Sequence, residues 1–203
     1  MADTTPRRYD PCDLIPEGAR RNLALAAIEA FGRHGFDGAN TRKIAEQVGM
    51  SSAGLYVHYA SKAKLLYTIA KVGHDSVLNA VNDAVRGIAE PDRRVHAWVS
   101  AFTRWHADNH ALARVNQYEL RSLEQEDFEI ISAIRRKTEA AAVREMRVLA
   151  PDDPDIRMTA RAILSMGIDV ARWYNPAAAR DSLALGDLYG TLALRMLRSD
   201  EAG

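Results

Sequence analysis

A single cysteine, Cys12, stands in this chain of 203 residues, so no disulfide can form within it and a reducing compartment suits it. The chain lacks a run of about eighteen apolar residues, and its first residues carry no apolar signal core, so we expect neither a membrane span nor secretion. Its 27 basic residues equal its 27 acidic ones, which excludes a global charge bias toward nucleic acid. These absences are typical of a cytoplasmic globular protein.

Catalytic and metal-binding motifs are also missing. The sequence shows no catalytic triad, no glycine-rich phosphate loop and no cysteine cluster. The segment from Gly49 to Ala53 approaches a nucleophile elbow, but an elbow needs a strand before its serine, and a helical pattern precedes it here. His106 and His110 have a spacing that can place two imidazoles on one metal, yet no third ligand is identifiable. The sequence therefore predicts no enzyme, no metal and no cofactor.

Helical periodicity is what the chain does have. From Glu17 to the C-terminus apolar residues recur at helical spacing, and no segment alternates as a strand does. We predict an all-α fold of about nine helices. Two short helices are expected within 41–60, and one helix begins after the break at 90–92 and runs to about 109. The others are expected at about 18–34, 61–87, 111–123, 128–149, 155–174 and 182–198.

The predicted helices divide the chain into three parts. Residues 1–16 are polar with three prolines and read as a flexible arm, in which Cys12 would be exposed. Arg7 and Arg8 could reach a DNA minor groove, although a tail without function explains them as well. We expect a first helical domain at 17–62 and a larger one at 63–203.

Two short helices joined by a tight turn are predicted between residues 40 and 66. Thr41 is a suitable N-cap for the first helix, because its hydroxyl can accept from a free amide. Gly49 falls where a helix favours a left-handed stop, and Ser51 can cap the next helix. Leu55 and Tyr59 would form the inward face of that second helix. This spacing matches a helix-turn-helix that binds DNA, although an ordinary helical hairpin also fits it.

This arrangement predicts which face of the second helix would contact DNA. Residues opposite Leu55 and Tyr59 would enter the major groove, and four basic residues against Glu46 give residues 41–64 a local charge of +3. Few of these side chains can read bases, so we expect phosphate contacts and operator shape to contribute strongly. The predicted DNA contacts are Thr41, Arg42, Ser52, Ala53, Gly54, Tyr56, His58 and Lys62.

The same stretch resembles a known family. AFGRHGFDGANTRKIAEQVGMSSAGLYVHYASKAKLL, within residues 18–66, is similar to the DNA-binding domain of TetR-type transcriptional regulators. The matching positions are Phe31, the Gly35–Phe36 pair, Thr41 to Ala45, Gly49, Leu55, Tyr56, Tyr59, Ser61 and Lys62. The resemblance implies that 17–62 is a DNA-binding domain and that 63–203 binds an effector and forms a dimer.

The last two predicted helices look too apolar to have one buried face each. Small residues are interleaved with their large apolar ones, which favours an antiparallel pair that meets its symmetry mate as a four-helix bundle. A monomer core is the alternative. The resemblance implies pairing through these helices, and we expect interface contacts from Met158, Gly167, Leu188, Leu192 and Met196.

The resemblance also implies a ligand cavity among the central helices. Our expected lining, which could instead be ordinary core, is Phe102, Trp105, Tyr118, Met166, Val170 and Trp173. The segment VARWYNP is similar to actinobacterial TetR-type regulators that sense CoA thioesters. In that case Arg172 or the run 135–137 could bind a CoA phosphate, although the run also reads as a solvated face. Leu164 and Ile168 are aliphatic where such relatives can carry polar or aromatic contacts.

Three functional hypotheses follow. The first is a homodimeric repressor that binds a pseudo-palindromic operator in double-stranded DNA and is released by a small hydrophobic effector, such as a CoA thioester or related lipid metabolite. The second is an acyl-thioester hydrolase, which the missing nucleophile motif disfavours. The third is an architectural DNA-binding dimer without an effector.

Overall fold

The computed structural model describes residues 11–177 and 181–198. Within those ranges the chain is helical, with nine α-helices, two short 3-10 helices and no strand. The elements are η1 (Pro11–Leu14), α1 (Ala19–Gly38), α2 (Thr41–Gln47), α3 (Ser52–His58), α4 (Lys62–Ala84), α5 (Pro91–Asp108), α6 (His110–Tyr118), η2 (Leu120–Ser122), α7 (Gln125–Arg147), α8 (Ile156–Trp173) and α9 (Ser182–Leu197). The all-α class and the expected number of helices are confirmed.

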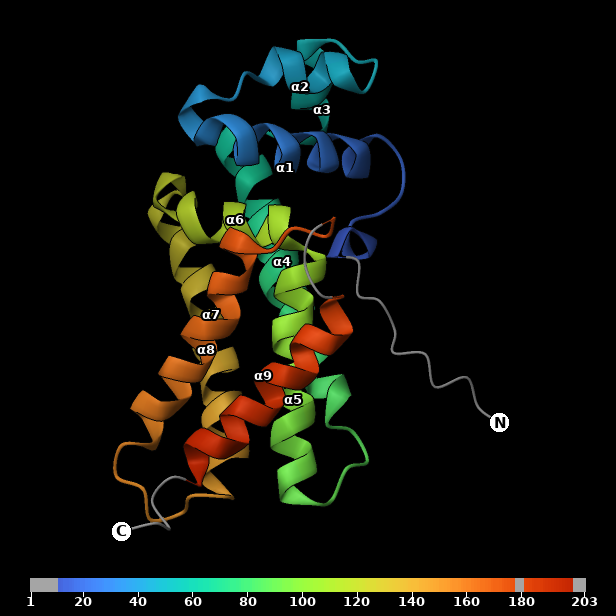
Figure 1. The fold of residues 1–203 in the computed structure, drawn as a ribbon. Helices are drawn as coiled ribbons and strands as arrows, with labels where there is room; N and C mark the ends of the chain where they lie inside the picture. Colours follow the sequence, from blue (N-terminus) through green and yellow to red (C-terminus); the bar gives the residue numbers. More distant parts are fainter. Residues whose placement is uncertain (1–10, 178–180, 199–203) are drawn as a thin grey trace.

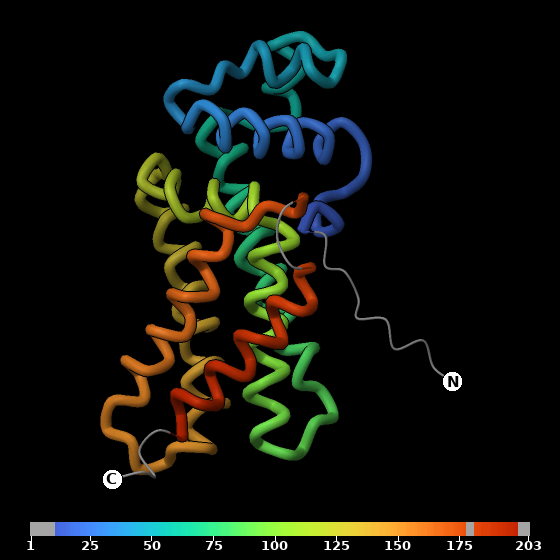
Figure 2. The backbone as a smooth tube through the Cα atoms, viewed as in Figure 1, coloured from blue at the N-terminus to red at the C-terminus, as the bar shows by residue number. Residues whose placement is uncertain are grey.

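The helices form a small end and a longer body. Figure 1 shows α1, α2 and α3 gathered at one end, with α2 and α3 farthest from the rest of the molecule. The tube view in Figure 2 follows the chain from this end into α4, which runs on into the body. In the body α5 contacts α4, α7, α8 and α9, so it is the central helix. Trp98 of α5 is among the largest fully buried side chains.

Glycines set how α9 packs. A Cβ at Gly186 would lie 2.7 Å from the carbonyl oxygen of Ser100, and one at Gly190 would lie 2.8 Å from that of His96. Only glycine permits so close an approach of two helix backbones. The principal neighbour of α9 is therefore α5, and its contact with α8 is slight. The sequence pattern suggested an α8–α9 pair instead.

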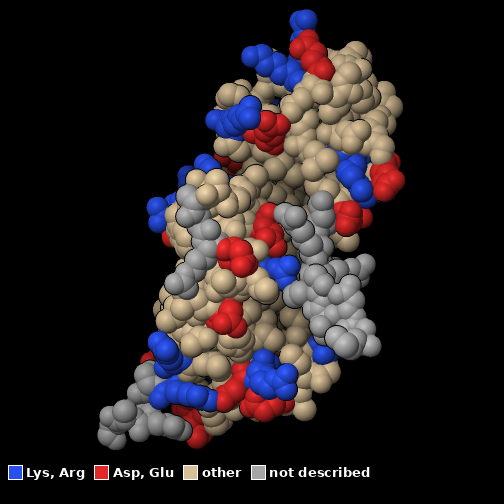
Figure 3. Space-filling view, turned by 45° about the vertical axis from the view of Figure 1, so that its right-hand side comes forward, with Lys and Arg blue, Asp and Glu red and all other residues tan. Residues whose placement is uncertain are grey.

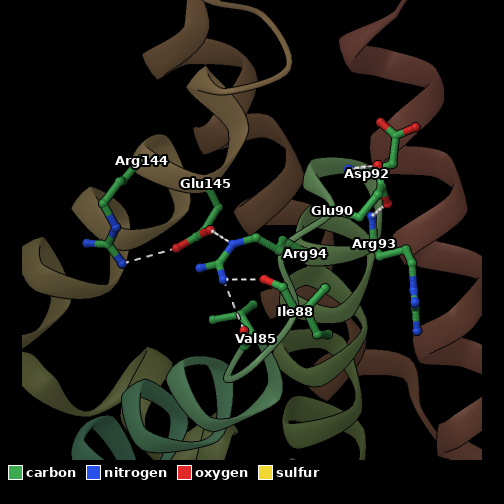
Figure 4. A network of polar contacts seen from close by, with 8 residues as sticks. All are labelled: Val85, Ile88, Glu90, Asp92, Arg93, Arg94, Arg144 and Glu145. Carbon is green, nitrogen blue, oxygen red and sulfur yellow. Dashed lines mark hydrogen bonds and ion pairs between the residues drawn. The ribbon is translucent and has the colours of Figure 1, made fainter.

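A partly buried arginine closes the far end of the body. Arg94 of α5 donates through Nε to Glu145 Oε2 of α7 at 2.9 Å, and through Nη1 to the carbonyl oxygens of Val85 and Ile88 at 3.1 and 2.7 Å. Figure 4 shows this guanidinium reaching between the α4–α5 connection and α7, with Arg144 on the opposite side of the Glu145 carboxylate. The Arg94 guanidinium therefore joins α5, the α4–α5 connection and α7.

Some local expectations need correction. Cys12 is buried, because η1 and the residue after it place Cys12 and Ile15 in the hydrophobic core. The first helix is interrupted at Gly35 (φ 69°, ψ 171°), where its end was predicted, and a short helical segment follows this kink to Gly38. The helix expected at 111–123 ends at Tyr118 and is followed by η2. Residues 1–10, with Arg7 and Arg8, lie outside the described part of the chain.

Candidate DNA-binding and effector-binding sites

The helix-turn-helix is held by caps at both of its helix starts. Asn40, and not Thr41, caps α2, because its Oδ1 accepts from the backbone nitrogens of Arg42 at 2.9 Å and Lys43 at 3.4 Å. Ser51 caps α3 as predicted, with Oγ accepting from Gly54 N at 3.1 Å. Gly49 has φ 72°, the left-handed conformation expected at the turn. Ser51, the central serine of the elbow-like segment Gly49 to Ala53, therefore serves as a helix cap.

Two side chains attach α3 to the domain. Leu55 and Tyr59 are buried, and the Tyr59 hydroxyl donates to the carbonyl oxygen of Arg20 at 2.8 Å. Burial raises the pKa of Tyr59, although the nearby Arg20 guanidinium opposes this shift. The inward face predicted from spacing is confirmed, and it fixes the orientation of the opposite face.

The opposite face of α3 is open to solvent. Tyr56 is 47% exposed and Val57 is 82% exposed, beside exposed Ala53. The Tyr56 hydroxyl lies 3.3 Å from Thr41 Oγ1, which joins α3 to the first residue of α2. Of the remaining predicted contacts, Ser52 and His58 are partly exposed, and Gly54 lies against Met50 of the turn.

Three of the four basic residues around this face already have partners in the structure. Arg42 donates to Glu46 at 2.8 Å, which raises the pKa of the guanidinium. The Lys62 ammonium donates to the carbonyl oxygen of Ala39 at 2.9 Å and lies 4.5 Å from the centre of the Phe36 ring. Lys64 binds Asp127 of α7 at 2.7 Å. The face drawn in Figure 3 accordingly shows basic and acidic side chains interspersed at the helix-turn-helix end.

A cavity of about 290 Å³ lies between α4, α5, α6, α7 and α8. Phe102 and Trp105 line it as expected. Tyr118 and Trp173 lie at exposed positions instead, and Met166 and Val170 pack elsewhere in the helical core. The lining also includes His74, His106 and Asn116, for which the sequence suggested no effector contact. Arg135, Leu164 and Ile168, which the resemblance had connected with CoA binding, line it too.

Two histidines in the cavity wall are neutral. His106 Nδ1 lies 2.8 Å from the carbonyl oxygen of Phe102, so this nitrogen carries the proton and donates. Burial lowers the pKa of His106 to about 4, against the opposing effect of that hydrogen bond. The pKa of His74 falls to about 3 through burial first, and then through the charges of Arg135 and His106. In the described residues no cluster of three or more metal-ligating side chains occurs.

The five predicted interface residues differ in exposure. Met158 and Leu188 are exposed, as are Trp173 and Leu183, whereas Leu192 and Met196 are partly buried. Gly167 is buried within the chain, where a Cβ would lie 2.8 Å from Phe102 Cδ1. Four large apolar side chains of α8 and α9 thus remain uncovered in the single chain. Across the described ranges no helix is both long and apolar enough to cross a membrane.

The fold and the exposed α3 are those of a helix-turn-helix transcriptional regulator. A model of the tetR family of bacterial regulatory proteins matches residues 24–68, and a tetracyclin repressor-like C-terminal domain matches residues 89–197. Because this second match alone spans more than half of the chain, the protein belongs to the TetR family of DNA-binding transcriptional regulators.

Individual relatives agree with this assignment. A crystal structure of a tetR-family regulatory protein from Rhodococcus RHA1 is 41% identical, with a TM-score of 0.82, and the match covers 90% of this chain and 98% of that one. The transcriptional activator FasR of Mycolicibacterium smegmatis is 25% identical over 79% of this chain and 74% of its own. AibR, solved with isovaleryl coenzyme A and operator DNA, shares the fold at 21% identity, with a TM-score of 0.76 and coverage of 85% of this chain and 96% of that one.

Proposed function

We propose that this regulator is a homodimeric repressor that binds a pseudo-palindromic operator and is released by a small hydrophobic effector. The proposal depends on one observation. An anchored α3 presents an exposed face, and the same chain holds a cavity whose wall includes α4, the helix that follows α3. In a helix-turn-helix the second helix enters the major groove. Ser52, Tyr56 and Val57 would then be the side chains nearest to the bases.

Dimer formation is supported by the uncovered apolar residues of α8 and α9. Leu188 and Leu183 of α9 and Met158 and Trp173 of α8 are exposed although each is large and apolar. Large apolar side chains that a single chain leaves exposed can mark a protein interaction surface. A twofold axis through this surface would pair two recognition helices with two operator half-sites.

A CoA thioester is the effector class that we favour. Phe102, Trp105, Leu164 and Ile168 give the cavity an apolar wall, and Arg135 lines it from an exposed position on α7. Its guanidinium suits a phosphate. Arg172 suits a phosphate less, because its guanidinium donates twice to Asp169, at 2.7 and 2.9 Å. AibR, which has the same fold, was solved with a CoA thioester bound.

The central experiment is a titration of the full-length protein into labelled DNA from the region that flanks its own gene. We expect one shifted complex that survives excess unrelated DNA, with a stoichiometry of two chains or a multiple of two. Addition of acyl-CoAs should dissociate it, because an effector shifts the equilibrium only by binding the released state better. Absence of any sequence preference at low salt would exclude operator binding.

Transcription measured in vitro from the same DNA decides between repression and activation. We expect the protein to lower transcript yield and an effector to restore it. FasR is named an activator, so a rise in transcript yield on addition of the protein alone would replace the repressor proposal with an activator one.

A further inference from the structure

The cavity wall contains buried polar atoms that have no hydrogen-bond partner. Asn116 of α6 is only 6% exposed, and its Oδ1 is buried and unpaired. Nε2 of His74 on α4 is buried and unpaired as well. Both residues line the cavity. Burial of a polar atom without a hydrogen-bond partner is unfavourable. Two such atoms in one cavity wall therefore indicate a site in which a bound ligand supplies the missing hydrogen bonds.

The α4 helix is shaped to accommodate the Asn116 amide. Gly73 lies in the interior of α4, directly before His74, and a Cβ there would stand 2.2 Å from Asn116 Nδ2. Glycine inside a helix is unfavourable compared with alanine. The glycine is explained by the space that the amide takes, so the packing of two helices holds Asn116 against α4 at Gly73, the residue before His74 in the same cavity wall.

The chemistry of these groups restricts what they can bind. His106 donates through Nδ1 to Phe102, so its other ring nitrogen has a lone pair to accept with. Asn116 Oδ1 is also an acceptor, so the missing partner must donate a hydrogen bond. Two guanidinium groups, of Arg135 and Arg161, line the cavity against one carboxylate, of Glu139, and this net positive charge disfavours an ammonium group. A carboxylate or a ketone has no proton to donate, whereas a hydroxyl is a neutral donor that can also accept.

We propose that the effector carries a hydroxyl group on an apolar body, with the hydroxyl bound among Asn116, His74 and His106 and the body against Phe102, Trp105 and Leu164. This inference rests on the proposed effector function and adds the chemical class of the ligand. A plain alkyl or acyl chain would leave the same polar atoms unpaired.

The test uses pairs of probes that differ by one hydroxyl. Three pairs are titrated into the full-length protein by calorimetry: 3-hydroxyoctanoyl-CoA and octanoyl-CoA, the two corresponding free acids, and 3-(4-hydroxyphenyl)propanoic and 3-phenylpropanoic acid. In every pair that binds, we expect the hydroxylated member to bind at least roughly tenfold more tightly, since a site built for a hydroxyl rejects the analogue without it. It should also dissociate the operator complex at a lower concentration.

The outcomes separate this inference from the effector function. Equal affinities within the pairs, or a preference for the unhydroxylated member, would overturn the hydroxyl inference while the effector function stands. Failure of all six probes to bind would overturn the hydroxyl inference. If a metabolite mixture also failed to dissociate the operator complex, the effector function would fall with it.

Two variants locate the effect in the cavity. Asn116→Leu keeps the size of the side chain and removes its amide, so the affinity ratio within a pair should fall toward one. Asn116 packs tightly against Gly73, so a substitution of Asn116 can also disturb the fold. His106→Phe is therefore the second variant, because it removes a different acceptor. Thr103→Val is the matched control: it removes a buried hydroxyl that is also unpaired but does not line the cavity, and should keep the ratio. A ratio unchanged in both cavity variants would contradict the proposal.

Discussion

Glu119, at the end of α6, accepts a hydrogen bond from the backbone nitrogen of Phe36 in α1, with 2.9 Å between Oε2 and N and 83 residues between the two positions. Gly35 leaves the helical conformation just before Phe36, and the carboxylate of Glu119 binds the amide that follows this bend. The same α6 carries Asn116 into the cavity wall. One short helix thus contacts both the candidate effector site and the DNA-binding domain.

We expect Glu119→Ala to lower the free energy of unfolding by about 1.5–3 kcal/mol, because it removes a charge-assisted hydrogen bond to a part-buried amide. Urea denaturation measures this loss, and hydrogen exchange at Phe36 should become faster. Glu119→Gln keeps an acceptor oxygen and should lose less. Unchanged exchange at Phe36 in Glu119→Ala would show that the bond does not hold the bend.

Tyr56→Ala should weaken operator binding by about 1–3 kcal/mol, the range of a good base contact, while leaving the dimer intact. Fluorescence anisotropy with operator DNA measures the change. Tyr118→Ala is the control, since Tyr118 is 49% exposed, like Tyr56, but lies on α6. Equal affinity of Tyr56→Ala and the unchanged protein would mean that the exposed face of α3 has been assigned wrongly.

Leu188→Glu should disrupt dimerisation, because it places a charge within the exposed apolar surface of α9. Sedimentation or light scattering should show a shift from dimer to monomer at micromolar concentration. Val148→Glu is the control, as Val148 is also exposed but follows α7. A dimeric Leu188→Glu would locate the interface elsewhere.

Arg94→Met should destabilise the fold by about 3–5 kcal/mol, because it leaves the buried Glu145 carboxylate without its closest cation. Arg144→Met should cost under about 1 kcal/mol, since Arg144 is 64% exposed and meets the same carboxylate from solvent. Thermal and urea unfolding of both variants make the comparison. Similar losses in the two would mean that Glu145 is neutralised equally from either side.

Acid should destabilise the protein through its cavity histidines. The pKa of His106 is about 4 in the fold against an ordinary value of 6.5, so the unfolded chain binds the proton first as the pH falls. The stability from this residue is complete above pH 6.5 and is lost between pH 6.5 and 4, at about 1.4 kcal/mol per pH unit. Urea unfolding at pH 7 and pH 5 measures the slope.

His106→Gln should reduce this slope, and His34→Gln controls for the loss of a surface histidine. The contribution of His74, whose pKa falls to about 3, has the same sign and should remain in the variant. A slope unaffected by His106→Gln would show that His106 is already protonated in the native protein near pH 5.

The helix-turn-helix could be predicted from sequence because its determinants are local. Gly49, Ser51 and Leu55 each act within one or two helical turns, and the structure confirms their conformation, cap and burial. The choice between Asn40 and Thr41 as the cap of α2 was beyond prediction, since both side chains can accept the same bonds and the decision depends on where the backbone turns.

The cavity was harder to predict because five helices create it together. Trp105 could be predicted in the cavity wall because it is a large aromatic residue of a central helix. His74 and Asn116 look like ordinary surface residues in the sequence, and only the packing of α4 against α6 brings them to the cavity. A weak signal was present in Gly73, a glycine inside a helical pattern that usually has a packing reason. Tyr118, by contrast, was expected in the cavity and is exposed, because it follows Asn116 by two residues, about half a helical turn, and so lies on the opposite side of α6.

The contact of α9 with the backbone of α5 has a mechanical meaning. At Gly186 and Gly190 the backbone of α9 lies directly against the backbone and side chains of Ser100 and His96, so sliding or rotation of one helix alone would produce collisions. Phe102 on α5 faces the cavity, and Leu188 on α9 faces solvent. We therefore expect the two helices to move together, so that a tilt of α5 imposed by a molecule in the cavity would also displace the exposed surface of α9.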